Sequence, residues 1–311
     1  MASTLETCAN TAGRPGSPSA GDTLYQIDTK QIITWDGSAW RLYDSDGTAV
    51  NDADITDLSP HLWLDPMHSA PFFTDSGKGT AVTADGKRVG CFADRSGNGF
   101  DFVQGTETAK PTLCLEAGVG AVPSLCYSQS DQLDLLGTSD SDISADQLTI
   151  FFVWRLAQEG SHWFIQGTSN SNNPRIRLNG SADSWYYQWY PFGAAEGDYS
   201  SGVDFSTTAT VGSAFASRHI YCLKTDLAGA DRTYTYNNGG ADIAGSTTSP
   251  DGGKFLEDGE TMKLFYGPSD NYSPHWLFEF LVFDSTLTDA NVNKVNSYLG
   301  NKHGITVTDV S

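Results

Sequence analysis

The chain has 311 residues, of which 39% are hydrophobic and 12% aromatic, and its 38 acidic and 18 basic side chains give a formal net charge of −20. A surface of this sign repels phosphate backbones and argues against nucleic acid as a partner. The most apolar runs, "LTIFFVW" and "WLFEFLVF", are far shorter than the ~20 residues of a membrane-spanning helix, so we expect no membrane insertion.

Residues 1–50 are predicted to form an N-terminal unit, an arm followed by a small β module. The run "TLYQIDTKQIITWDGSAW" holds two stretches rich in β-branched and aromatic residues, joined by a polar turn, with a second turn at Asp36-Gly37. An isolated hairpin is at best marginally stable in water, so this one needs neighbours. We expect a docking and oligomerisation element with five buried side chains: Tyr25, Ile27, Ile33, Trp35 and Trp40.

The polar, acidic residues 51–59 are predicted to be a linker, and residues 60–311 a single β domain. Short apolar runs bounded by Gly, Asn, Asp, Pro or Ser are typical of a sandwich or barrel, and the lack of intervening helices argues against an α/β fold. The expected strands are "HLWL", "KRVGCFA", "FDFV", "SLCYS", "QLDLL", "LTIFFVWRL", "HWFIQG", "PRIRLN", "SWYYQWY", "HIYCLKT", "RTYTYN", "MKLFYG" and "WLFEFLVF".

The last of these strands is mostly apolar on both sides, which predicts a central strand that is buried on two faces or covered by a loop. Strict alternation places Trp276, Phe278, Phe280 and Val282 on one face and Leu277, Glu279, Leu281 and Phe283 on the other.

One C-terminal helix is expected after this strand. Thr288 is its predicted N-cap, Lys302 and His303 lie in its last turn, and Gly304 ends it. Apolar residues at helical spacing predict that it packs on the sandwich.

Cysteine usage favours a structural role for the thiols. Four of the five cysteines, Cys91, Cys114, Cys126 and Cys222, lie in apolar strand-like runs, and no CxxC or Cys/His cluster indicates zinc. We expect reduced, buried side chains.

The order of these runs resembles concanavalin A-like, laminin G-like jelly-roll domains, from Ser59 to about Thr306. The resemblance rests on "LSPHLWLDP", "VGCFADRSGNGFDF", "KPTL", "SLCYSQSDQLDL", "LTIFFVWR" and "FEFLVFDSTLTDANVNKVNSYLGNKHGI". It implies an all-β fold, an antiparallel concanavalin A-like jelly-roll sandwich with one C-terminal helix, preceded by the small β-hairpin module. Many such domains bind glycans, but family membership alone decides no function.

The N-terminal stretch "GRPGSPSAGDTLYQIDTKQIITWDGSAWRLYDSDG" resembles a short β module found at the start of bacteriophage virion proteins, on fibres and capsid appendages. The GD-x-x-Y and DG-x-x-W elements carry this resemblance. It implies attachment to other virion proteins, as a capsid decoration, knob or tail fibre. By analogy with such modules, which supply each other's missing strands around a symmetry axis, we expect a homo-oligomer and favour a trimer.

Enzymatic activity is not expected. Glucanases of this fold need two carboxylates at alternating positions on one strand face, and the chain has no such spacing. Glu257 and Glu260 fall in a Gly-containing turn, and Glu279 stands alone among apolar residues. The chain also lacks the serine-hydrolase elbow, the HExxH motif and the phosphate-binding loop.

No cofactor is expected, and calcium is the one metal for which candidates exist. The candidate ligands are Asp52, Asp54, Asp57 and Asp94. No EF-hand spacing occurs, and we favour the alternative that these aspartates cap turns by accepting hydrogen bonds from backbone amides.

The run "SWYYQWYPF" is the candidate glycan-binding surface. As a strand it has aromatic residues on both faces, one set in the core and the other available to stack on sugar rings. The alternative, which we favour, is that a loop or a neighbouring subunit covers the second set. The candidate residues are Trp185, Tyr187, Trp189 and Tyr190.

Three functions follow, in order of preference. The first is a non-enzymatic phage virion structural protein displayed on the particle exterior. The second is a lectin-like module that binds host or environmental polysaccharide, which is compatible with the first, and the third is a glycoside hydrolase. Since the N-terminus has neither the basic nor the apolar stretch of a secretory signal, we expect synthesis in a cytosol and release by host lysis.

Overall fold

The structure is a computed structural model of residues 1–311. Side chains are described for residues 50–115, 122–126, 147–155, 218–225, 262–264 and 276–310 and for single positions elsewhere. The backbone is described for residues 6–8, 15–19, 22–26, 31–35, 40–42, 50–116, 122–127, 135–139, 147–156, 160–166, 175–181, 184–190, 205–207, 218–226, 232–238, 243–246, 261–264 and 275–310.

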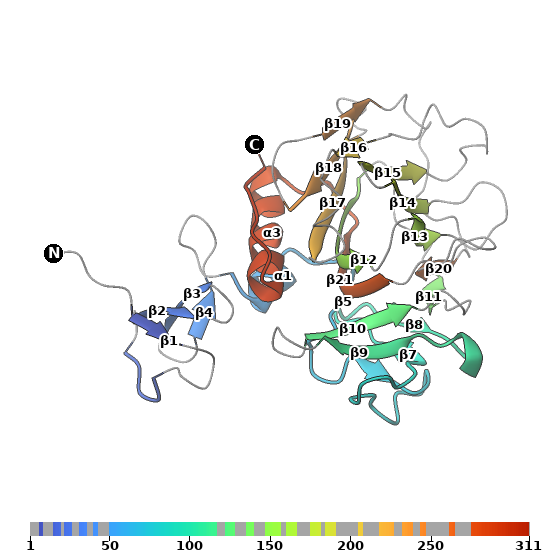
Figure 1. Ribbon diagram of the computed structural model, residues 1–311, viewed down its shortest axis with the longest axis horizontal. Helices are drawn as coiled ribbons and strands as arrows, with labels where there is room; N and C mark the ends of the chain where they lie inside the picture. Colours follow the sequence, from blue (N-terminus) through green and yellow to red (C-terminus); the bar gives the residue numbers. More distant parts are fainter. Residues whose placement is uncertain are drawn as a thin grey trace.

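Two antiparallel sheets form an all-β sandwich, as predicted (Figure 1). In the eight-stranded sheet the order is β19-β18-β17-β12-β21-β10-β9, and β5 also pairs with β21. Its strands are β5 (Leu62–Leu64), β9 (Thr112–Glu116), β10 (Val122–Tyr127), β12 (Thr149–Leu156), β17 (His219–Asp226), β18 (Arg232–Asn237), β19 (Ile243–Ser246) and β21 (His275–Phe283).

The nine-stranded sheet has the order β16-β15-β14-β13-β20-β11-β8-β7-β6. Its strands are β6 (Phe72–Phe73), β7 (Cys91–Phe92), β8 (Phe102–Val103), β11 (Leu135–Ser139), β13 (Gly160–Gln166), β14 (Arg175–Ser181), β15 (Ser184–Tyr190), β16 (Phe205–Thr207) and β20 (Thr261–Leu264). Each of the thirteen runs predicted as strands overlaps one of these elements, whereas β6, β9, β16 and β19 were not predicted.

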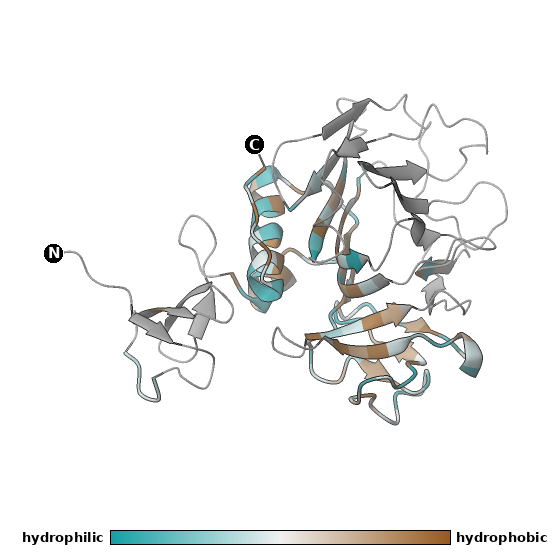
Figure 2. Cartoon of the chain, viewed as in Figure 1, coloured by the Kyte–Doolittle hydropathy of each residue, from teal (hydrophilic) through white to brown (hydrophobic). Residues whose placement is uncertain are grey.

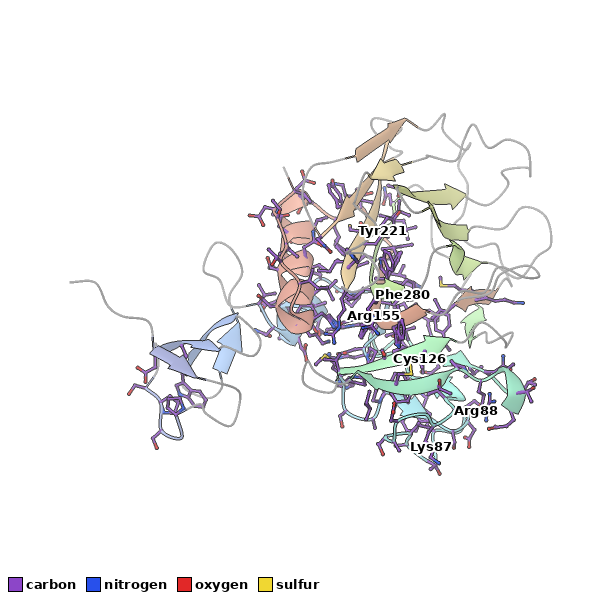
Figure 3. The ribbon with its side chains drawn as sticks, in the orientation of Figure 1. Lys87, Arg88, Cys126, Arg155, Tyr221 and Phe280 are labelled. Carbon is purple, nitrogen blue, oxygen red and sulfur yellow. A yellow bond between two sulfur atoms is a disulfide. The ribbon has the colours of Figure 1, made fainter. Side chains whose placement is uncertain are left out.

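The main core lies between the two sheets. β-branched, aromatic and leucine side chains alternate along the strands, so each sheet offers one apolar face to the other. Tyr221 and Phe280, both labelled in Figure 3, belong to this core. Its other large members include Phe72, Phe92, Phe102, Phe152 and Trp154.

A second core lies on the other face of the eight-stranded sheet. Helices α1 (Asp52–Asp57) and α3 (Asp289–His303) cover this face, as the ribbon shows (Figure 1). Along α3, hydrophilic and hydrophobic bands alternate (Figure 2). Val292, Val295 and Leu299 of α3 pack against Phe151, Phe278 and Phe283 of the sheet. Neither helix, nor any other in the described residues, is long and apolar enough to cross a membrane.

Strand β21 is central and buried on both faces, as predicted, but its alternation is interrupted. Val153 of β12 pairs with Glu279 and the next residue, Trp154, pairs with Leu277, so Phe278 is an extra residue. This β-bulge turns both Phe278 and Glu279 toward the helices, because a bulge places two successive residues against one partner residue. The predicted faces are therefore wrong on the N-terminal side of the bulge, where Leu277 and not Phe278 shares the inter-sheet core with Phe280.

The C-terminal helix α3 begins and ends as predicted. The Thr288 side chain accepts a hydrogen bond from the backbone N–H of Asn291, which satisfies one of the donors left open at a helix start. Gly304 ends the helix in the left-handed conformation at φ 69°, which a residue without Cβ adopts without strain.

Residues 51–59, predicted as a linker, instead contain helix α1. Asn51 caps it, because its side chain accepts from the Ala53 N–H while the Asp54 carboxylate accepts from the Asn51 N–H. Ile55 is fully buried and Val50 is 3% exposed, so this acidic segment is part of the second core. The acidic composition of this segment suggested a solvated linker. In the structure the carboxylates of Asp52 and Asp54 instead pair with Arg95 and cap the helix, respectively.

Cys114 and Cys126 form a disulfide, which corrects the expectation that they are reduced. In the β9–β10 register Cys114 pairs with Ser124, and Cys126 with Thr112, so the two cysteines are diagonal neighbours on adjacent strands. Spacing alone does not reveal such a register. Cys91 and Cys222 are free and buried, as expected, and burial raises the pKa of the Cys91 thiol to about 11.

The N-terminal unit forms its own four-stranded sheet, with the order β1-β2-β3-β4. Strands β2 (Thr23–Gln26) and β3 (Gln31–Trp35) are the predicted hairpin, and β4 (Trp40–Leu42) follows the second predicted turn. Strand β1 (Glu6–Cys8) was not predicted; it pairs in parallel with β2.

Gly90, which directly precedes β7, tests how closely the chain packs against Thr74, which directly follows β6. A Cβ atom on Gly90 would lie 2.1 Å from the carbonyl oxygen of Thr74, and a backbone atom cannot be displaced cheaply. We expect Gly90→Ala to lower the free energy of unfolding by about 2–4 kcal/mol, measured by denaturant titration. The control is Gly105→Ala, whose Cβ would meet no heavy atom within 4 Å, with an expected change within about 1 kcal/mol. Equal effects in the two variants would contradict this packing.

Candidate functional site

The densest group of titratable side chains in the described residues lies under helix α3. We call it the buried charge cluster. It is built by α1, β5, the residues after β5, the loop after β7, β21 and α3. Its members are Asp52, Trp63, Asp65, Arg95, Glu279, Tyr298, Lys302 and His303.

Glu279 is at the centre of this cluster and has no exposed surface. Its Oε1 accepts from the Trp63 indole Nε1 at 2.8 Å and from Lys302 Nζ at 2.9 Å. Its Oε2 lies 2.6 Å from His303 Nε2. Glu279 shares the helix-facing side of β21 with Leu281 and Phe283, as alternation on the C-terminal side of the bulge requires, and the bulge adds Phe278 to the same side.

Lys302 joins two buried carboxylates. Its ammonium lies 2.7 Å from Asp65 Oδ1 as well as 2.9 Å from Glu279 Oε1, and it donates to the Tyr298 hydroxyl at 2.8 Å. All three ammonium protons therefore have acceptors, which a buried Lys requires. Tyr298 in turn donates to Asp52 Oδ1 at 2.7 Å, which ties α3 to α1.

Arg95 closes the cluster on its outer side. Its Nη1 donates to Asp65 and its Nη2 to Asp52, each at 2.5 Å. The guanidinium carbon stacks over the Trp63 ring at 4.1 Å from the ring centre. One planar cation thereby hydrogen-bonds the segment after β5 and helix α1 and stacks on the face of a buried tryptophan.

The "DRSGNG" turn holds Arg95 in place. The Asp94 carboxylate accepts from the backbone N–H groups of Trp63, Ser96, Gly99 and Phe100 at 2.9–3.1 Å. Gly97 and Gly99 have positive φ, which bends the loop back onto that carboxylate.

Burial and charge act in opposite directions on the groups of the cluster. Burial alone would raise the pKa of Glu279, but the Lys302 charge and the hydrogen bonds from His303 and Trp63 outweigh it and hold that pKa below its usual value. Burial lowers the pKa of His303, against the pull of Glu279, so the ring is neutral. A neutral ring also fits its geometry, because Nε2–H donates to Glu279 while buried Nδ1 has no donor or acceptor near it in the described residues.

The buried charge cluster contains acid and base groups but is closed to substrate. Glu279, Asp65 and His303 are 0%, 2% and 3% exposed, and each carboxylate already binds a cation or N–H donor. A general acid or base must reach the reacting group to within a hydrogen bond or one bridging water. The cluster therefore stabilises the fold. The sequence alone indicates Glu279 only as an isolated acid. Its position in an otherwise apolar strand was the one sequence feature that could have indicated a buried, paired carboxylate.

The calcium candidates are dispersed. Asp52 and Asp54 lie at the start of α1, where Asp52 pairs with Arg95 and Asp54 accepts from the Asn51 N–H, while Asp57 ends α1. Asp94 lies in the loop after β7 and binds backbone amides. No group of three or more metal-binding side chains occurs among the residues that the structure describes.

Strand register places the aromatic strand β15 relative to the core. Leu264 of β20, in the core between the sheets, pairs with Ile165 of β13. Ile165 pairs with Ile176 of β14, and Ile176 pairs with Trp189 of β15. Directly paired residues share a face of a sheet, so Trp189 lies on the inner face.

The four candidate glycan-binding residues therefore divide between two faces. Trp185 and Tyr187 share the inner face with Trp189, because they lie at alternate positions. Tyr190 lies on the outer face, paired with Arg175 of β14. Their side chains are outside the described residues, so the glycan role of these residues stays a prediction.

Three of the five predicted docking residues share one face of the N-terminal sheet. Ile33 pairs with Leu24, and Trp35 pairs with Trp40. Leu24, which sequence analysis missed, is 2% exposed and identifies this face as the packed one. Tyr25 lies on the opposite face, and Ile27 is outside the described residues.

No family model and no curated protein matches this sequence. Its fold is shared with solved structures of botulinum neurotoxin binding domains. A structure of type C, a toxin that depends on two ganglioside molecules to enter cells, aligns with a TM-score of 0.53 at 14% identity. The binding domain of type DC with rat synaptotagmin II aligns at 0.52 and 15%, and the receptor-binding domain of type D at 0.52 and 10%.

These alignments cover 78–80% of this chain but 52–53% of the toxin chains, so this chain spans about half the length of the structures it matches. Identity this low shows a common fold and nothing about the ligand. The common fold is a β-rich sandwich of the kind present in receptor-binding domains.

Replacing Glu279 tests the role of the buried charge cluster. Glu279→Gln removes one of the two buried carboxylate charges that pair with Lys302, and we expect it to lower the free energy of unfolding by about 3 kcal/mol at pH 7, measured by denaturant titration. In the native chain the folded pKa of Glu279 lies below its unfolded value of about 4.3, so its contribution is full above that pH and is lost as pH falls through the folded pKa. As pH falls through this range, the free energy of unfolding should therefore decrease less in the variant than in the native protein.

The matched control is Glu107→Gln. Glu107 pairs with Lys110 at 2.7 Å but its side chain is 70% exposed, so its substitution should leave the free energy of unfolding nearly unchanged. Equal destabilisation by the two substitutions would contradict a stabilising role for the buried carboxylate. So would the same decrease of the free energy of unfolding with falling pH in the native protein and in Glu279→Gln.

Proposed function

We propose that this chain is a non-enzymatic carbohydrate-binding protein. The observation that carries the proposal is the shared fold with toxin receptor-binding domains over about four-fifths of the chain. Gangliosides are the glycan-bearing molecules named for one of these toxins, and we extend glycan recognition to this chain as a proposal. The sandwich would then be a concanavalin A-like, laminin G-like domain.

The register of β15 supports a sugar-binding surface on the outer face of the nine-stranded sheet. Tyr186, Gln188 and Tyr190 alternate along β15 on this face. Their partners on β14 are Asn179, Arg177 and Arg175, so aromatic and polar residues form one continuous patch. Aromatic rings stack on the apolar faces of sugars, while amides and guanidinium groups bind hydroxyls.

Two observations support a binding role without catalysis. The carboxylates of the buried charge cluster are buried or bound to cations. The solved structures of similar fold named above are receptor-binding domains and not enzymes. A screen for turnover of β-glucans and capsular polysaccharide tests this part of the proposal, and turnover abolished by a single Asp or Glu substitution would overturn it.

Glycan binding is tested with an array of neutral and acidic oligosaccharides. We expect micromolar to millimolar binding that Tyr190→Ala weakens by about tenfold with an unchanged melting temperature, because loss of one stacked ring costs about 1–1.5 kcal/mol. Trp189→Ala, on the core-facing row, should instead lower the melting temperature. The control Met67→Ala removes a side chain 43% exposed in the turn after β5 and should change neither quantity. Absence of binding to every glycan would overturn the proposal.

We also propose that the chain is displayed on the exterior of a phage virion, as a homotrimer attached through the N-terminal sheet. The support is the resemblance of residues 1–50 to virion-protein modules and the separate sheet that they form. In that arrangement Ile33, Trp35 and Trp40 would dock against sister chains or the particle.

Deletion of residues 1–49 tests this display. Because Val50 and Ile55 pack in the second core, the deletion must stop at residue 49 to leave the sandwich folded. We expect a truncated chain with native-like thermal unfolding that is absent from particles, judged by electron microscopy with antibody against the sandwich. Full-length chain on particles is the positive control, and its absence there would overturn the virion proposal without bearing on glycan binding.

A further inference from the structure

A cleft of about 580 Å³ opens at the end of the sandwich beside β6 and β7. Its walls are residues 81–84 and 86–88, together with Thr74, Glu107 at the start of the 3₁₀ turn η2 (Glu107–Ala109) and Lys110 just after that turn. Small residues line much of it, which leaves room for a ligand, and the volume lies within the ~300–1,000 Å³ typical of small-molecule sites. In Figure 3 its residues Lys87 and Arg88 lie at the edge of the molecule away from α3.

The charge of this cleft is opposite to that of the whole chain. Three cationic side chains, Lys87, Arg88 and Lys110, and one carboxylate, Glu107, line it. The lining therefore carries a net charge of +2 in a chain whose net charge is −20. A local positive field within an acidic surface concentrates anions at one place.

Two of the cations are held by the fold. Arg88 Nη1 donates to the carbonyl oxygens of Thr108 and Lys110 at 3.3 and 3.1 Å, which ties the strand-like segment to η2 without using a carboxylate. Lys110 Nζ donates to the carbonyl oxygen of Thr74 at 2.9 Å and to Glu107 at 2.7 Å. Arg88 is therefore fixed in position without a salt bridge among the described residues, although the hydrogen bond from Lys110, together with the charges of Lys110 and Arg88, lowers the pKa of Glu107 in the same lining.

Lys87 differs from these two residues. Its backbone is fixed, because its carbonyl accepts from the Leu113 N–H at 2.8 Å and the Gly86 N–H donates to the Leu113 carbonyl at 2.8 Å. Its side chain is exposed and its ammonium has no ion-pair partner in the part of the chain that the structure describes. Lys87 therefore contributes charge to the cleft without holding the fold together.

We propose that this cleft binds the anionic group of an acidic sugar, the carboxylate or sulfate of a negatively charged polysaccharide. The inference rests on the proposed glycan-binding function and names its substrate class. Arg88 and Lys87 supply charge and N–H donors to the anion, and the exposed lining residue Thr83 has a hydroxyl that can bind a sugar oxygen. The acidic surface around the cleft repels polyanions elsewhere, which restricts such a ligand to this place.

The test is calorimetric titration of the full chain with three probes: a galacturonate hexamer, a sulfated galactan oligosaccharide and neutral maltohexaose. We expect binding of at least one anionic probe, weakened by added salt, and no binding of the neutral probe in the cleft. Lys87→Glu should weaken anionic binding by about tenfold, whereas Lys87→Arg should stay within about twofold of the native chain. The matched control is Lys294→Glu, which makes the same charge change on α3, outside the cleft, and should also stay within about twofold.

The outcomes separate this inference from the proposed function. Binding of only the carboxylated or only the sulfated probe, sensitive to Lys87→Glu, supports the cleft and identifies its anion. Glycan binding that is equal in the native chain and Lys87→Glu, or binding of neutral glycans alone, overturns the cleft while the proposed function stands. Failure to bind any glycan overturns both.

Discussion

Burial of the Glu279 carboxylate is the constraint on which the outer face of the eight-stranded sheet depends. Removing such a group from water costs several kcal/mol, and only close donors offset that cost. The donors come from Trp63 on β5 and from Lys302 and His303 on α3, so the carboxylate fixes both elements at once. The second layer of partners, Asp65 and Arg95 with Asp52, then fixes α1 and the loop after β7.

This arrangement separates stability from recognition. Helices α1 and α3 and the buried charge cluster occupy the outer face of the eight-stranded sheet, which leaves Glu279, Asp65 and His303 out of reach of a ligand. The outer face of β15 and the cationic cleft beside β6 and β7 both belong to the nine-stranded sheet or its connections. The two proposed ligand-binding surfaces therefore lie on that sheet or its connections, while the N-terminal sheet is the proposed means of attachment.

The strand positions and the C-terminal helix were predictable because they depend on local patterns. Alternating apolar residues between turn residues marked the strands, and Thr288 and Gly304 marked the ends of α3. The bulge at Phe278, helix α1 and the Cys114–Cys126 disulfide were not predicted. Each depends on a partner distant in the chain or on a strand register that residue spacing does not encode. The candidate site was harder still: neither the buried charge cluster nor the cationic cleft corresponds to any sequence motif.

The sequence by itself determined the all-β class, most of the strands, the capped C-terminal helix and the acidic character of the chain. These properties follow from residue composition and from periodicities of two and 3.6 residues, which neighbouring residues specify. Only the tertiary structure decided that Glu279 faces α3, that Trp189 and not Tyr190 lies on the core-facing side of β15, and that Lys87, Arg88 and Lys110 line one cleft. The reason is physical: a side chain's electrostatic environment is set by groups that meet only when sheets pair and pack, over sequence separations as large as the 246 residues between Asp52 and Tyr298.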